Sequence, residues 1–462
     1  MIVFDCQCSF SQVNQQKQDS IKIQNAIEKF SEKGKPAKLL QRVLFEPAAK
    51  QYIKKNSYHK SINFNYAAFE GKIIRKITIT TLDPFGYSEI DSTKVTINNL
   101  NKLGNTLHYK TRKITIKNLL LIKTNQPLDS LLLKESERLI RSQKYIRAVS
   151  TTINLVSESS DYVDVYIRVL DSWSLIPSFS TSTSKSMFKL TDRNFLGLGH
   201  ECSNTVNSRF EDNKTTYSIS YSIPNVLQKS IKTAINYQKD FEDNDIKSIN
   251  IERPFFSAYS HWAGGIYFDE QFKKEVMSND NLIFKSQNIK YNSQDYWVGK
   301  SFPLFNGITE YFRTTNIFVN ARFFNKKYTE QPDIAFDSLQ IFSSEKLYLA
   351  SVGFASRKYT QDKFLFNFNV TEDIASGFLY AFTGGYQVKN NIGRYYFGAK
   401  IAIGKFFTFG YLSTSIDYGT YFKEKTTEQS ALNLNLVYFT NLIETNRWKF
   451  RQFYYILKLL GV

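Results

Sequence analysis

From Asp171 onward, apolar and small polar side chains alternate in runs of roughly ten residues. The clearest runs are 216–225, 364–370 and 431–439. A period of two places alternate side chains on opposite faces of a β-strand. The first run would place Tyr217, Ile219, Tyr221 and Ile223 on one face, the second Phe364, Phe366 and Phe368, and the third Leu432, Leu434 and Leu436. Further strand-like runs lie near 260–268, 310–324, 345–356, 377–388, 394–403 and 406–421.

An apolar strand face is either the core of a soluble sandwich or a surface that meets lipid. Well over ten such segments within about 290 residues are too many for one ordinary sandwich. Their length suits tilted spans of about 9–11 residues. Tyr and Phe gather at segment ends, as in "GRYYFGAK" and "GKFFTFGY", which is typical of aromatic girdles. We therefore predict that residues 171–462 form an all-β antiparallel transmembrane β-barrel, possibly incomplete, of roughly 10–14 strands.

Residues 72–170 have a different pattern. A strand is expected at 72–82, a turn at "DPFG" (83–86), helices beginning at 113–122 and at 130–146, and a hairpin of strands 148–156 and 162–170. This order predicts a small α+β domain with helices on one face of its sheet. Residues 13–71 are a polar, helical or loose lead-in.

The segment 130–146 shows the strongest helical pattern in the chain. Ser130 is the expected N-cap, and Leu132, Leu139 and Ile146 recur seven residues apart as the expected core face. The charged residues could suggest a site, but their spacings of three and four favour ion pairs on a solvated helix face. They are Glu135, Glu137, Arg138 and Arg141.

Composition and charge exclude one class of membrane protein and argue against one class of partner. The longest aliphatic stretch is only "LLLI" at 119–122, which excludes a membrane protein built from helices. The net charge of +18 is uneven, with 27 Lys/Arg against 15 Asp/Glu in residues 1–170 and 33 against 27 in the remainder. The lysines are scattered and no RNA-type motif occurs, so nucleic acid is not an expected partner.

Three cysteines, Cys6, Cys8 and Cys202, provide no disulfide framework. Cys6 and Cys8 lie in "MIVFDCQCSFSQ", an apolar piece that ends in small residues. Residues 1–12 resemble the tail of a signal peptide whose beginning is missing, and an ordinary disordered N-terminus fits equally well.

The stretch "LTDRNFLGLGHECSNTV" (190–206) contains Gly197 and Gly199, which raises the question of a phosphate-binding loop. A dinucleotide fingerprint needs a third glycine, where this chain has Cys202, and then a helix. β-formers follow instead, so we expect a turn between strands, with Phe195 as its bulky anchor and no cofactor.

Catalytic chemistry is not indicated either. The four histidines, His59, His108, His200 and His261, lack metal-ligand spacing, and we expect no metal site. Ser260 and His261 are neighbours that point to opposite strand faces. No G-x-S-x-G motif occurs. We expect no enzyme.

The order of several short motifs resembles the BamA/TamA-like superfamily of outer-membrane assembly and translocation proteins. They are "KITITTLDPFG" (76–86), "LHYKT" (107–111), "ESERLIRSQKYIRAV" (135–149), "VDVYIRVLDSWSL" (163–175), "DRNFLGLGHE" (192–201), "YSIPN" (221–225) and "ERPFFS" (252–257). The resemblance covers roughly residues 72–460. It implies one polypeptide-transport-associated (POTRA) domain at 72–170, followed by a bacterial surface antigen-type barrel at 171–462. It also implies family-motif roles for Asp192, Asn194, Phe195, Gly197 and Gly199, and for Pro84, Phe85 and Gly86.

Two departures from the family pattern stand out. The family's inward-folded loop carries an Arg-Gly-Phe type motif, and this chain has no Arg-Gly dipeptide. Family barrels have sixteen strands and usually end on an aromatic residue, whereas this chain ends "KFRQFYYILKLLGV". We interpret the end as a truncation or frame shift near residue 453, which would leave unpaired strand edges in lipid.

The resemblance implies a non-enzymatic factor for outer-membrane protein assembly or translocation. Its N-terminal domain would lie in the periplasm of a Gram-negative bacterium, with membrane lipid, unfolded outer-membrane proteins and accessory subunits as partners. Sheet edges, including that of a first barrel strand near 173–182, would pair with client strands through backbone groups. A passive pore or secretion channel is the alternative, which would leave the front domain unexplained.

Overall fold

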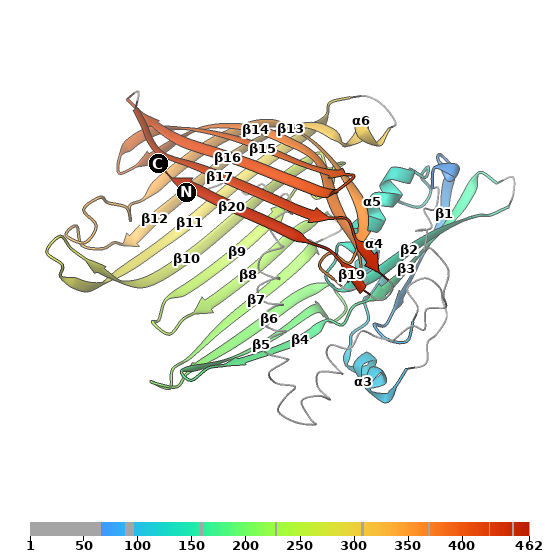
Figure 1. Cartoon of the computed structure of the whole chain (residues 1–462), viewed down its shortest axis with the longest axis horizontal. Helices are drawn as coiled ribbons and strands as arrows, with labels where there is room; N and C mark the ends of the chain where they lie inside the picture. Colours follow the sequence, from blue (N-terminus) through green and yellow to red (C-terminus); the bar gives the residue numbers. More distant parts are fainter. Residues whose placement is uncertain are drawn as a thin grey trace. The chain divides into compact units, whose positions relative to one another are not determined.

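The computed structural model describes residues 66–87, 97–157, 160–226, 229–305, 309–367, 370–424, 426–445 and 448–461. The chain divides into two compact units, and the second is Cys202–Val462. Figure 1 labels the elements along the chain. The expected features of residues 1–12 and 13–65 lie outside the described residues.

A mixed three-stranded sheet organises the first unit. β1 (Ile73–Leu82) pairs in parallel with β3 (Tyr162–Asp171), and β3 pairs antiparallel with β2 (Ile146–Leu155), giving the order β1-β3-β2. The predicted strand at 72–82 and the predicted hairpin are therefore confirmed. β3 is central, and its alternate residues Val163 and Val165 are fully buried because both flanking strands and the helices cover them.

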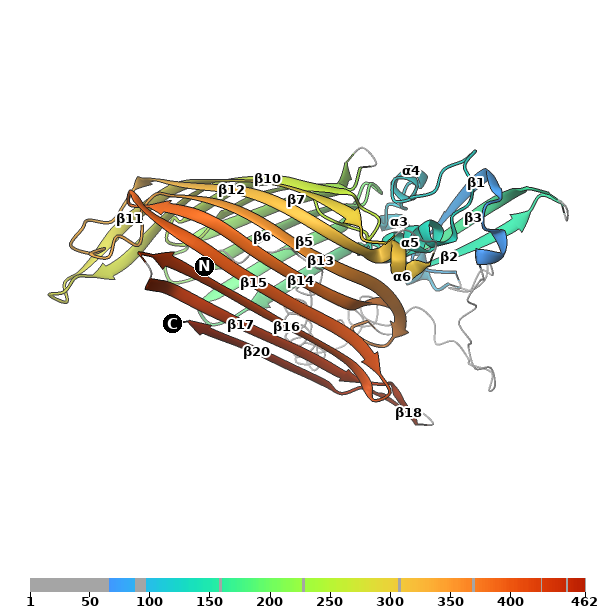
Figure 2. The same cartoon turned by 90° about the horizontal axis from the view of Figure 1, so that it is seen from above.

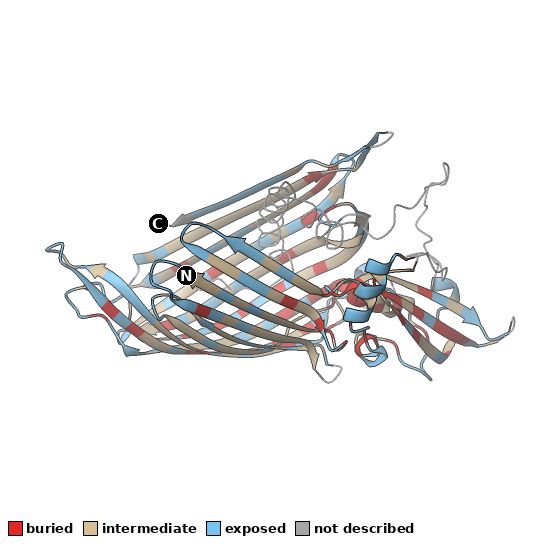
Figure 3. Cartoon of the chain, turned by 90° about the horizontal axis from the view of Figure 1, so that it is seen from below, coloured by how far each residue is buried: buried red, intermediate tan, exposed pale blue. Residues whose placement is uncertain are grey.

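Short helices complete the first unit. They are the 3-10 turn η1 (Tyr66–Phe69) and the α-helices α3 (Asn99–Leu107), α4 (Lys113–Lys117) and α5 (Ser130–Arg141). The core joins the sheet to α4 and α5 through Ile74, Ile116, Leu133, Ile140 and Val169. Figure 3 shows this concentration of buried residues. No helix of the described residues, including α6 (Glu310–Thr314), is long and apolar enough to cross a membrane.

Helix α5 differs from its prediction in register. Asp129, not Ser130, is the N-cap, and its carboxylate accepts from the backbone N–H groups of Leu131 and Leu132 at 3.1 Å each. The fully buried residues are Leu133 and Ile140, one position beyond the predicted Leu132 and Leu139. Leu139 is still buried, and Leu132 packs against the core's edge. The helix ends at Arg141, so the buried Ile146 begins β2 instead of ending the helix.

A fifteen-stranded antiparallel sheet dominates the rest of the chain, in the order β20-β17-β16-β15-β14-β13-β12-β11-β10-β9-β8-β7-β6-β5-β4. Sequence neighbours pair as in a meander. The strands are β4 (Leu175–Thr181), β5 (Lys185–Phe195), β6 (His200–Arg209), β7 (Thr215–Val226), β8 (Ile231–Lys239), β9 (Asp245–Arg253), β10 (Trp262–Ser278), β11 (Phe284–Pro303), β12 (Thr315–Glu330), β13 (Glu345–Lys363), β14 (Thr371–Lys389), β15 (Ile392–Phe407), β16 (Gly410–Lys423), β17 (Thr426–Thr440) and β20 (Phe453–Gly461). A small hairpin, β18 (Ile443–Thr445) with β19 (Trp448–Phe450), lies between the last two.

The strand number exceeds the predicted 10–14. The early strands are only 7–12 residues long and are joined by tight turns, so more strands fit into the same length of chain. Several of them, such as β8 and β9, have too few alternating apolar residues to be recognised from the pattern.

The predicted strand at 364–370 is wrong. β13 ends at Lys363, and residues 364–367 form a bend before β14. Phe364 has φ of 60°, and the carboxylate of Glu372 accepts from the backbone N–H groups of Leu365 and Phe366 at 3.0 Å each. Phe366 therefore belongs to a loop, and Phe368 lies outside the described residues. The runs at 216–225 and 431–439, in contrast, lie within β7 and β17 as predicted.

The strands of Cys202–Val462 lie side by side in the large sheet (Figure 2), and the sheet presents two chemically different faces. On what we call the apolar face, register partners such as Val352 and Phe382 lie side by side with half their surface exposed, at 50% and 58%. On the polar face, Arg322 donates through Nε to Asp295 at 2.8 Å and Lys400 pairs with Asp417 at 2.9 Å. Exposed aromatic and aliphatic residues concentrate on the apolar face, where the ion pairs of Glu270 with Lys247 and Lys290 lie toward one margin.

Candidate functional site: the β5–β6 turn and the open strand edges

The "NFLGLG" stretch forms the turn between β5 and β6, as predicted. Leu196, Gly197 and Gly199 have φ of 55°, 72° and 72°, all in the left-handed region. The backbone N–H of Gly197 donates to the carbonyl of Asn194 at 2.8 Å, and that of Leu198 to the carbonyl of Phe195 at 3.1 Å. Positive φ is the conformation that glycine adopts without steric cost, so two of the three positions carry glycine.

Asn194 fastens the turn to the segment after α3. Its side chain is fully buried. The amide nitrogen donates to the carbonyl of Tyr109 at 3.1 Å and to the hydroxyl of Thr111 at 2.9 Å, and the amide oxygen accepts from Gly199 N–H at 2.8 Å. Asp192 in turn accepts from the backbone N–H of Asn194 at 2.9 Å. Three of the predicted motif residues thus act together.

The carbonyl groups of the turn face the start of α4. Gly197 O accepts from the backbone N–H of Arg112 at 2.9 Å and from the Thr115 hydroxyl at 3.1 Å, while Leu196 O accepts from Arg112 Nε at 3.2 Å. The N–H groups of Gly197, Leu198 and Gly199 are already used within the turn. A phosphate needs N–H donors directed outward, so this turn presents the wrong polarity to hold one.

Gly199 lies against a ring. A Cβ there would be 2.7 Å from the hydroxyl oxygen and ring carbon of Tyr145, and a Cβ at Gly197 would overlap the backbone carbonyl of Lys110. Burial and the nearby Asp171 raise the pKa of Tyr145, so the phenol stays neutral. Lys144 pairs with Glu201 at 2.9 Å beside it. The anchor for the turn is therefore Tyr145, and the predicted anchor Phe195 is 37% exposed.

A buried polar cluster lies next to Thr111. Asp171, the last residue of β3, accepts through Oδ2 from His108 Nε2 at 3.0 Å and from Thr111 N–H at 2.8 Å. His108 Nδ1 lies 3.4 Å from the Ser174 hydroxyl. The side chains of His108 and Asp171 have no exposed surface. Because Asp171 and Ser174 flank the link between β3 and β4, the cluster fixes the direction in which the chain enters the large sheet.

Ser174, His108 and Asp171 have the connectivity of a hydrolase triad, which invites an enzymatic interpretation. The three residues are 4%, 8% and 0% exposed, and the groove described below is lined by other residues. A nucleophile that a substrate cannot reach has no catalytic role, so we assign the cluster to structure. Within the described ranges, no group of three or more His, Cys, Asp or Glu side chains could hold a metal ion.

The "DPFG" motif packs against the same cluster. Asn105 bonds to both backbone groups of Phe85, accepting from its N–H at 3.3 Å and donating to its carbonyl at 3.0 Å. The Phe85 ring lies 6.0 Å from Trp173, which lies 6.5 Å from His108. Pro84 is buried and Gly86 has φ of 90°. The structure thus brings together the motifs at 83–86, 107–111, 171–175 and 192–199.

The charged residues of α5 correct a sequence expectation. Glu135 and Arg138 form a two-point ion pair, with Nε and Nη2 donating at 2.8 and 2.7 Å, and both are less than 10% exposed. They are therefore buried, not on a solvated face, since α5 packs on the sheet over a wider arc than its leucines suggest. Glu137, half-buried, accepts from the Tyr66 hydroxyl at 3.4 Å, and Arg141 is also half-buried.

β2 provides an open edge in the small sheet. Val156 N–H donates to the carbonyl of Tyr162 at 3.3 Å, which fixes the alternation of the β2–β3 ladder. With the observed register, the backbone groups of Asn154 face β3 and those of Leu155 and Ile153 face away. The backbone carbonyl of Thr151 also faces away from β3, because it accepts a hydrogen bond of 3.4 Å from the Tyr66 hydroxyl. β2 is the terminal strand of this sheet in the described part of the chain.

β4 provides a second edge, at one end of the large sheet. Arg193 N–H donates to Ser174 O at 3.0 Å and Ser182 N–H to Lys185 O at 2.8 Å. In an antiparallel ladder, the backbone groups of successive residues face the partner strand and then face away from it. Those of Ser174 and Ser182 face β5, so those of Phe179 and Thr181 face away from it. Pro177 occupies the same outward series, so its missing N–H leaves a gap in the row of donors.

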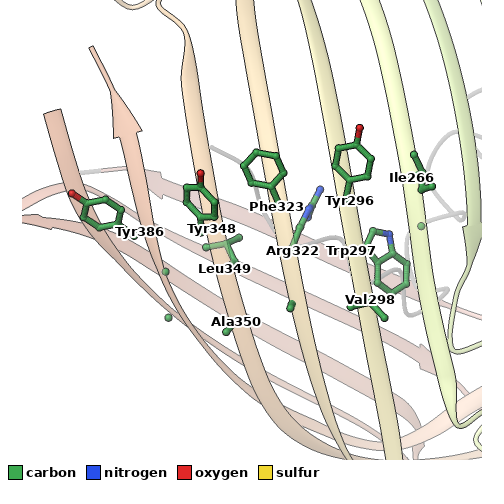
Figure 4. Close-up of a pocket in the computed structure, with 14 residues that line it drawn as sticks. Ile266, Tyr296, Trp297, Val298, Arg322, Phe323, Tyr348, Leu349, Ala350 and Tyr386 are labelled. Atoms are coloured by element: carbon green, nitrogen blue, oxygen red, sulfur yellow. The ribbon is translucent and has the colours of Figure 1, made fainter. Parts of the chain in front are cut away.

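The apolar face of Cys202–Val462 carries a row of rings. Tyr296, Phe323, Tyr348 and Tyr386 are consecutive register partners on β11, β12, β13 and β14, and Figure 4 shows them side by side. The Phe323 and Tyr348 rings lie 5.0 Å apart. Smaller residues follow the row and, with the rings, line a shallow groove of about 780 Å³. They include Val298, Ala321, Ala350 and Gly384.

No protein-family model and no curated protein matches the chain. The chain is similar to three solved structures. BamA from Haemophilus ducreyi lacking POTRA domains 1–3 is 10% identical, with 84% of each chain covered and a TM-score of 0.33. CdiB from Acinetobacter baumannii is 12% identical over 85% of this chain and 74% of that one, with a TM-score of 0.35. CdiB from Escherichia coli is 10% identical over 96% and 99%, with a TM-score of 0.33.

Proposed function

We propose that the chain is an outer-membrane assembly or translocation factor of the BamA/TamA-like superfamily, with one POTRA-like domain and a transmembrane β-barrel portion. The observation that carries the proposal is the two-sided antiparallel sheet. Its apolar face exposes large side chains on strand after strand, including Val319, Val352, Phe382 and Ile401 at 42–58%. Water does not tolerate so large a continuous apolar surface, whereas lipid does.

The dimensions of the apolar face support a membrane span. On β15 the outward residues run from Tyr395 to Ile403, and the eight residue-to-residue steps between them cover about 26 Å along the strand. A tilt of about 40° reduces this to about 20 Å of height, close to the apolar band of about 25 Å in membrane barrels. Aromatic rings at one end and polar residues beyond them suit an interface.

The side of the membrane on which residues 66–171 lie is proposed from chain direction. In an antiparallel meander, the ends of β9, β11, β13 and β15 lie on the side of the membrane from which the chain enters β4. Residues 66–171 immediately precede β4 and so belong to that side, which in this superfamily is the periplasm. The links through Asn194, Tyr145 and Asp171 then hold the first unit's helices to the turn at the membrane surface.

The mechanism is backbone pairing without catalysis. An open edge offers a row of N–H and C=O groups that a client strand can complete. The β2 edge, with Ile153 and Leu155 directed outward, would hold an unfolded client in extended form. The β4 edge would continue pairing within the membrane. Neither step needs a reactive side chain or a cofactor.

A matched pair of proline variants tests the β2 edge. Leu155→Pro removes only an outward N–H, so we expect the chain to fold normally and to capture less client. Asn154→Pro removes an N–H that bonds to β3, so it should unfold the small sheet. The client is an unfolded eight-stranded outer-membrane protein. A photoreactive group that replaces Tyr162 in the wild-type or variant chain crosslinks the client when it binds.

We expect Leu155→Pro to reduce crosslinking and the rate of client insertion into vesicles several-fold, with unchanged circular dichroism. Equal client insertion by Leu155→Pro and the wild type would contradict the role of this edge. Failure of the wild type to float with lipid vesicles would contradict the membrane placement itself.

A further inference from the structure

Four cations lie on the apolar face of Cys202–Val462, and no ion pair joins them to an acidic residue in the described part of the chain. They are Arg253 on β9, Lys300 on β11, Lys358 on β13 and Lys405 on β15. Each lies near the end of its strand on the same margin of the sheet, which we call the first rim. The opposite margin, where these strands begin, is the second rim.

The register places all four on the apolar side. Lys300 is the partner of Val319 and Val319 of Val352. Lys358 lies four residues after Phe354 and Lys405 two residues after Ile403, so each shares the face of its exposed apolar neighbour. Charged side chains of the polar face, such as Lys400 and Arg322, do form ion pairs. The apolar face also carries the Lys247–Glu270–Lys290 group and Lys274, but these lie toward the opposite margin, so the four cations are distinguished by the margin on which they lie.

Each cation lies against an aromatic ring. Arg253 is 5.1 Å from the Phe256 ring centroid, Lys358 is 5.4 Å from that of Tyr311, and Lys405 is 5.5 Å from that of Phe407. Lys300 lies between two rings, 4.8 Å from Trp262 and 4.9 Å from Phe302. The rings shield the aliphatic part and the charge of each side chain from hydrocarbon without neutralising that charge.

Arg253, Lys300 and Lys405 follow one level if the strands are tilted, whereas Lys358, which is in register with Lys405 through Ser376, lies about two residues off that level. Arg253 is in register, through β10 to β14, with Phe397 on β15, and Lys405 lies eight residues further along that strand. A tilt of about 40° shifts a level line by about 1.2 residues per strand, or about seven residues over six strands. Lys300 is in register, through β12 to β14, with Ala399 on β15, and Ala399 lies six residues before Lys405. The tilt predicts an offset of about five residues over these four strands.

We propose that the first rim binds the phosphates of phospholipid headgroups in one leaflet, through Arg253, Lys300, Lys358 and Lys405. Cations without an acidic partner among the described residues, along one margin and beside rings that prefer the interface, complement the anionic layer where headgroups begin, and the Arg253 guanidinium also donates to the carbonyls of Lys229 and Trp262. The proposal rests on the membrane placement proposed above. It adds the lipid chemistry that this rim selects, in the leaflet where β9, β11, β13 and β15 end.

The test measures lipid selectivity of the full chain in vesicles of phosphatidylcholine. Spin-labelled phosphatidylglycerol and spin-labelled phosphatidylcholine are compared by the fraction of each that the protein immobilises. We expect the wild type to prefer phosphatidylglycerol by a factor of roughly two to three at low salt, and the preference to shrink in 0.5 M NaCl because salt screens surface charge.

The first-rim variant is Arg253→Gln, Lys300→Gln, Lys358→Gln and Lys405→Gln combined, and it should lose the preference. The control variant removes the same charge at the second rim, through Lys239→Gln, Lys247→Gln, Lys285→Gln and Lys346→Gln, and should keep it. A third variant with arginine at positions 300, 358 and 405 keeps the charge and should keep the preference, which separates charge from folding.

Three results would overturn the proposal: equal binding of both lipids by the wild type, an unchanged preference in the folded first-rim variant, or loss of preference in the second-rim control. If the wild type does not enter vesicles at all, the proposed membrane function fails as well. A folded protein that enters the bilayer without selectivity refutes the rim alone, so the two failures are distinguishable.

Discussion

The side-chain amide of Asn194, in the β5–β6 turn, donates a hydrogen bond of 2.9 Å to the hydroxyl of Thr111, which precedes α4. The same amide bonds to Tyr109 O and to Gly199 N–H, so one buried side chain joins two segments that are 83 residues apart. Thr111 also donates its backbone N–H to Asp171. The turn, the segment after α3 and the end of β3 are therefore one hydrogen-bonded assembly.

Asn194→Ala should destabilise the first unit by roughly 2–3 kcal/mol, because it leaves a buried carbonyl and a buried N–H without partners. Urea unfolding followed by Trp173 fluorescence would measure this. Asn204→Ala, on the strand after the turn, is the control and should change stability by less than about 0.5 kcal/mol. Equal stability of the two variants would show that the Asn194 network contributes nothing.

Gly197→Val and Gly199→Val should both impair folding, because each position combines a φ of 72° with contact to Lys110 O or to Tyr145. Gly384→Val is the matched control, since a Cβ there has no atom within 4 Å. Heat-modifiable migration and yield in membranes are the measurements. ATP or NAD should protect none of these proteins from proteolysis, and saturable nucleotide binding by the wild type would contradict the structural role of the turn.

Val352→Arg places a charge in the middle of the apolar face and should cost roughly 2–4 kcal/mol in membrane assembly. Phe366→Arg, in the bend after β13, is the control and should assemble with nearly normal yield. The measurement is folded yield in vesicles. If the two arginine variants assemble alike, the apolar face does not meet lipid.

The Arg75–Asp164 pair predicts a dependence of stability on pH. Hydrogen bonding to Arg75 lowers the pKa of Asp164 below its usual 3.8, with Nε donating at 2.9 Å. A carboxylate whose pKa is lower in the folded state stabilises the fold above its unfolded pKa, and that stability is lost as the pH falls through the folded pKa. The difference between the wild type and Arg75→Gln should be constant above about pH 4.5 and vanish at lower pH. A difference that does not change with pH would contradict this assignment.

The alternation of apolar and polar residues correctly predicted those strands in which every second side chain lies on the apolar face. β7 and β17 were predictable because Tyr, Ile and Leu recur at every second position. The same pattern failed at 364–367, where alternating Phe and Asn lie in a bend held by Glu372. Helix α3 carries Gly104 and several asparagines, which weaken a helical pattern, and it was not predicted.

The candidate site was predictable only in its parts. The glycines and Asn194 could be named from the motif, but the partners Thr111 and Tyr145 depend on tertiary packing that no local pattern reports. His108 lies more than 60 residues from Asp171 and Ser174 in sequence and meets them only through the fold. The burial of Glu135 and Arg138 has the same cause, because their spacing alone cannot distinguish a solvated pair from a buried one.

Pro177 sets a limit on how long a partner can stay at the β4 edge. A strand that pairs there finds no N–H at position 177, so one of its carbonyl groups has no donor from this chain. In water that carbonyl is solvated at little cost, but in hydrocarbon it costs several kcal/mol. Pairing is therefore weakest where the edge is surrounded by lipid, and a client that completes its own sheet gains by leaving. The β4 edge would therefore bind a client strand only transiently. The missing backbone N–H of Pro177 would favour release of the folded product.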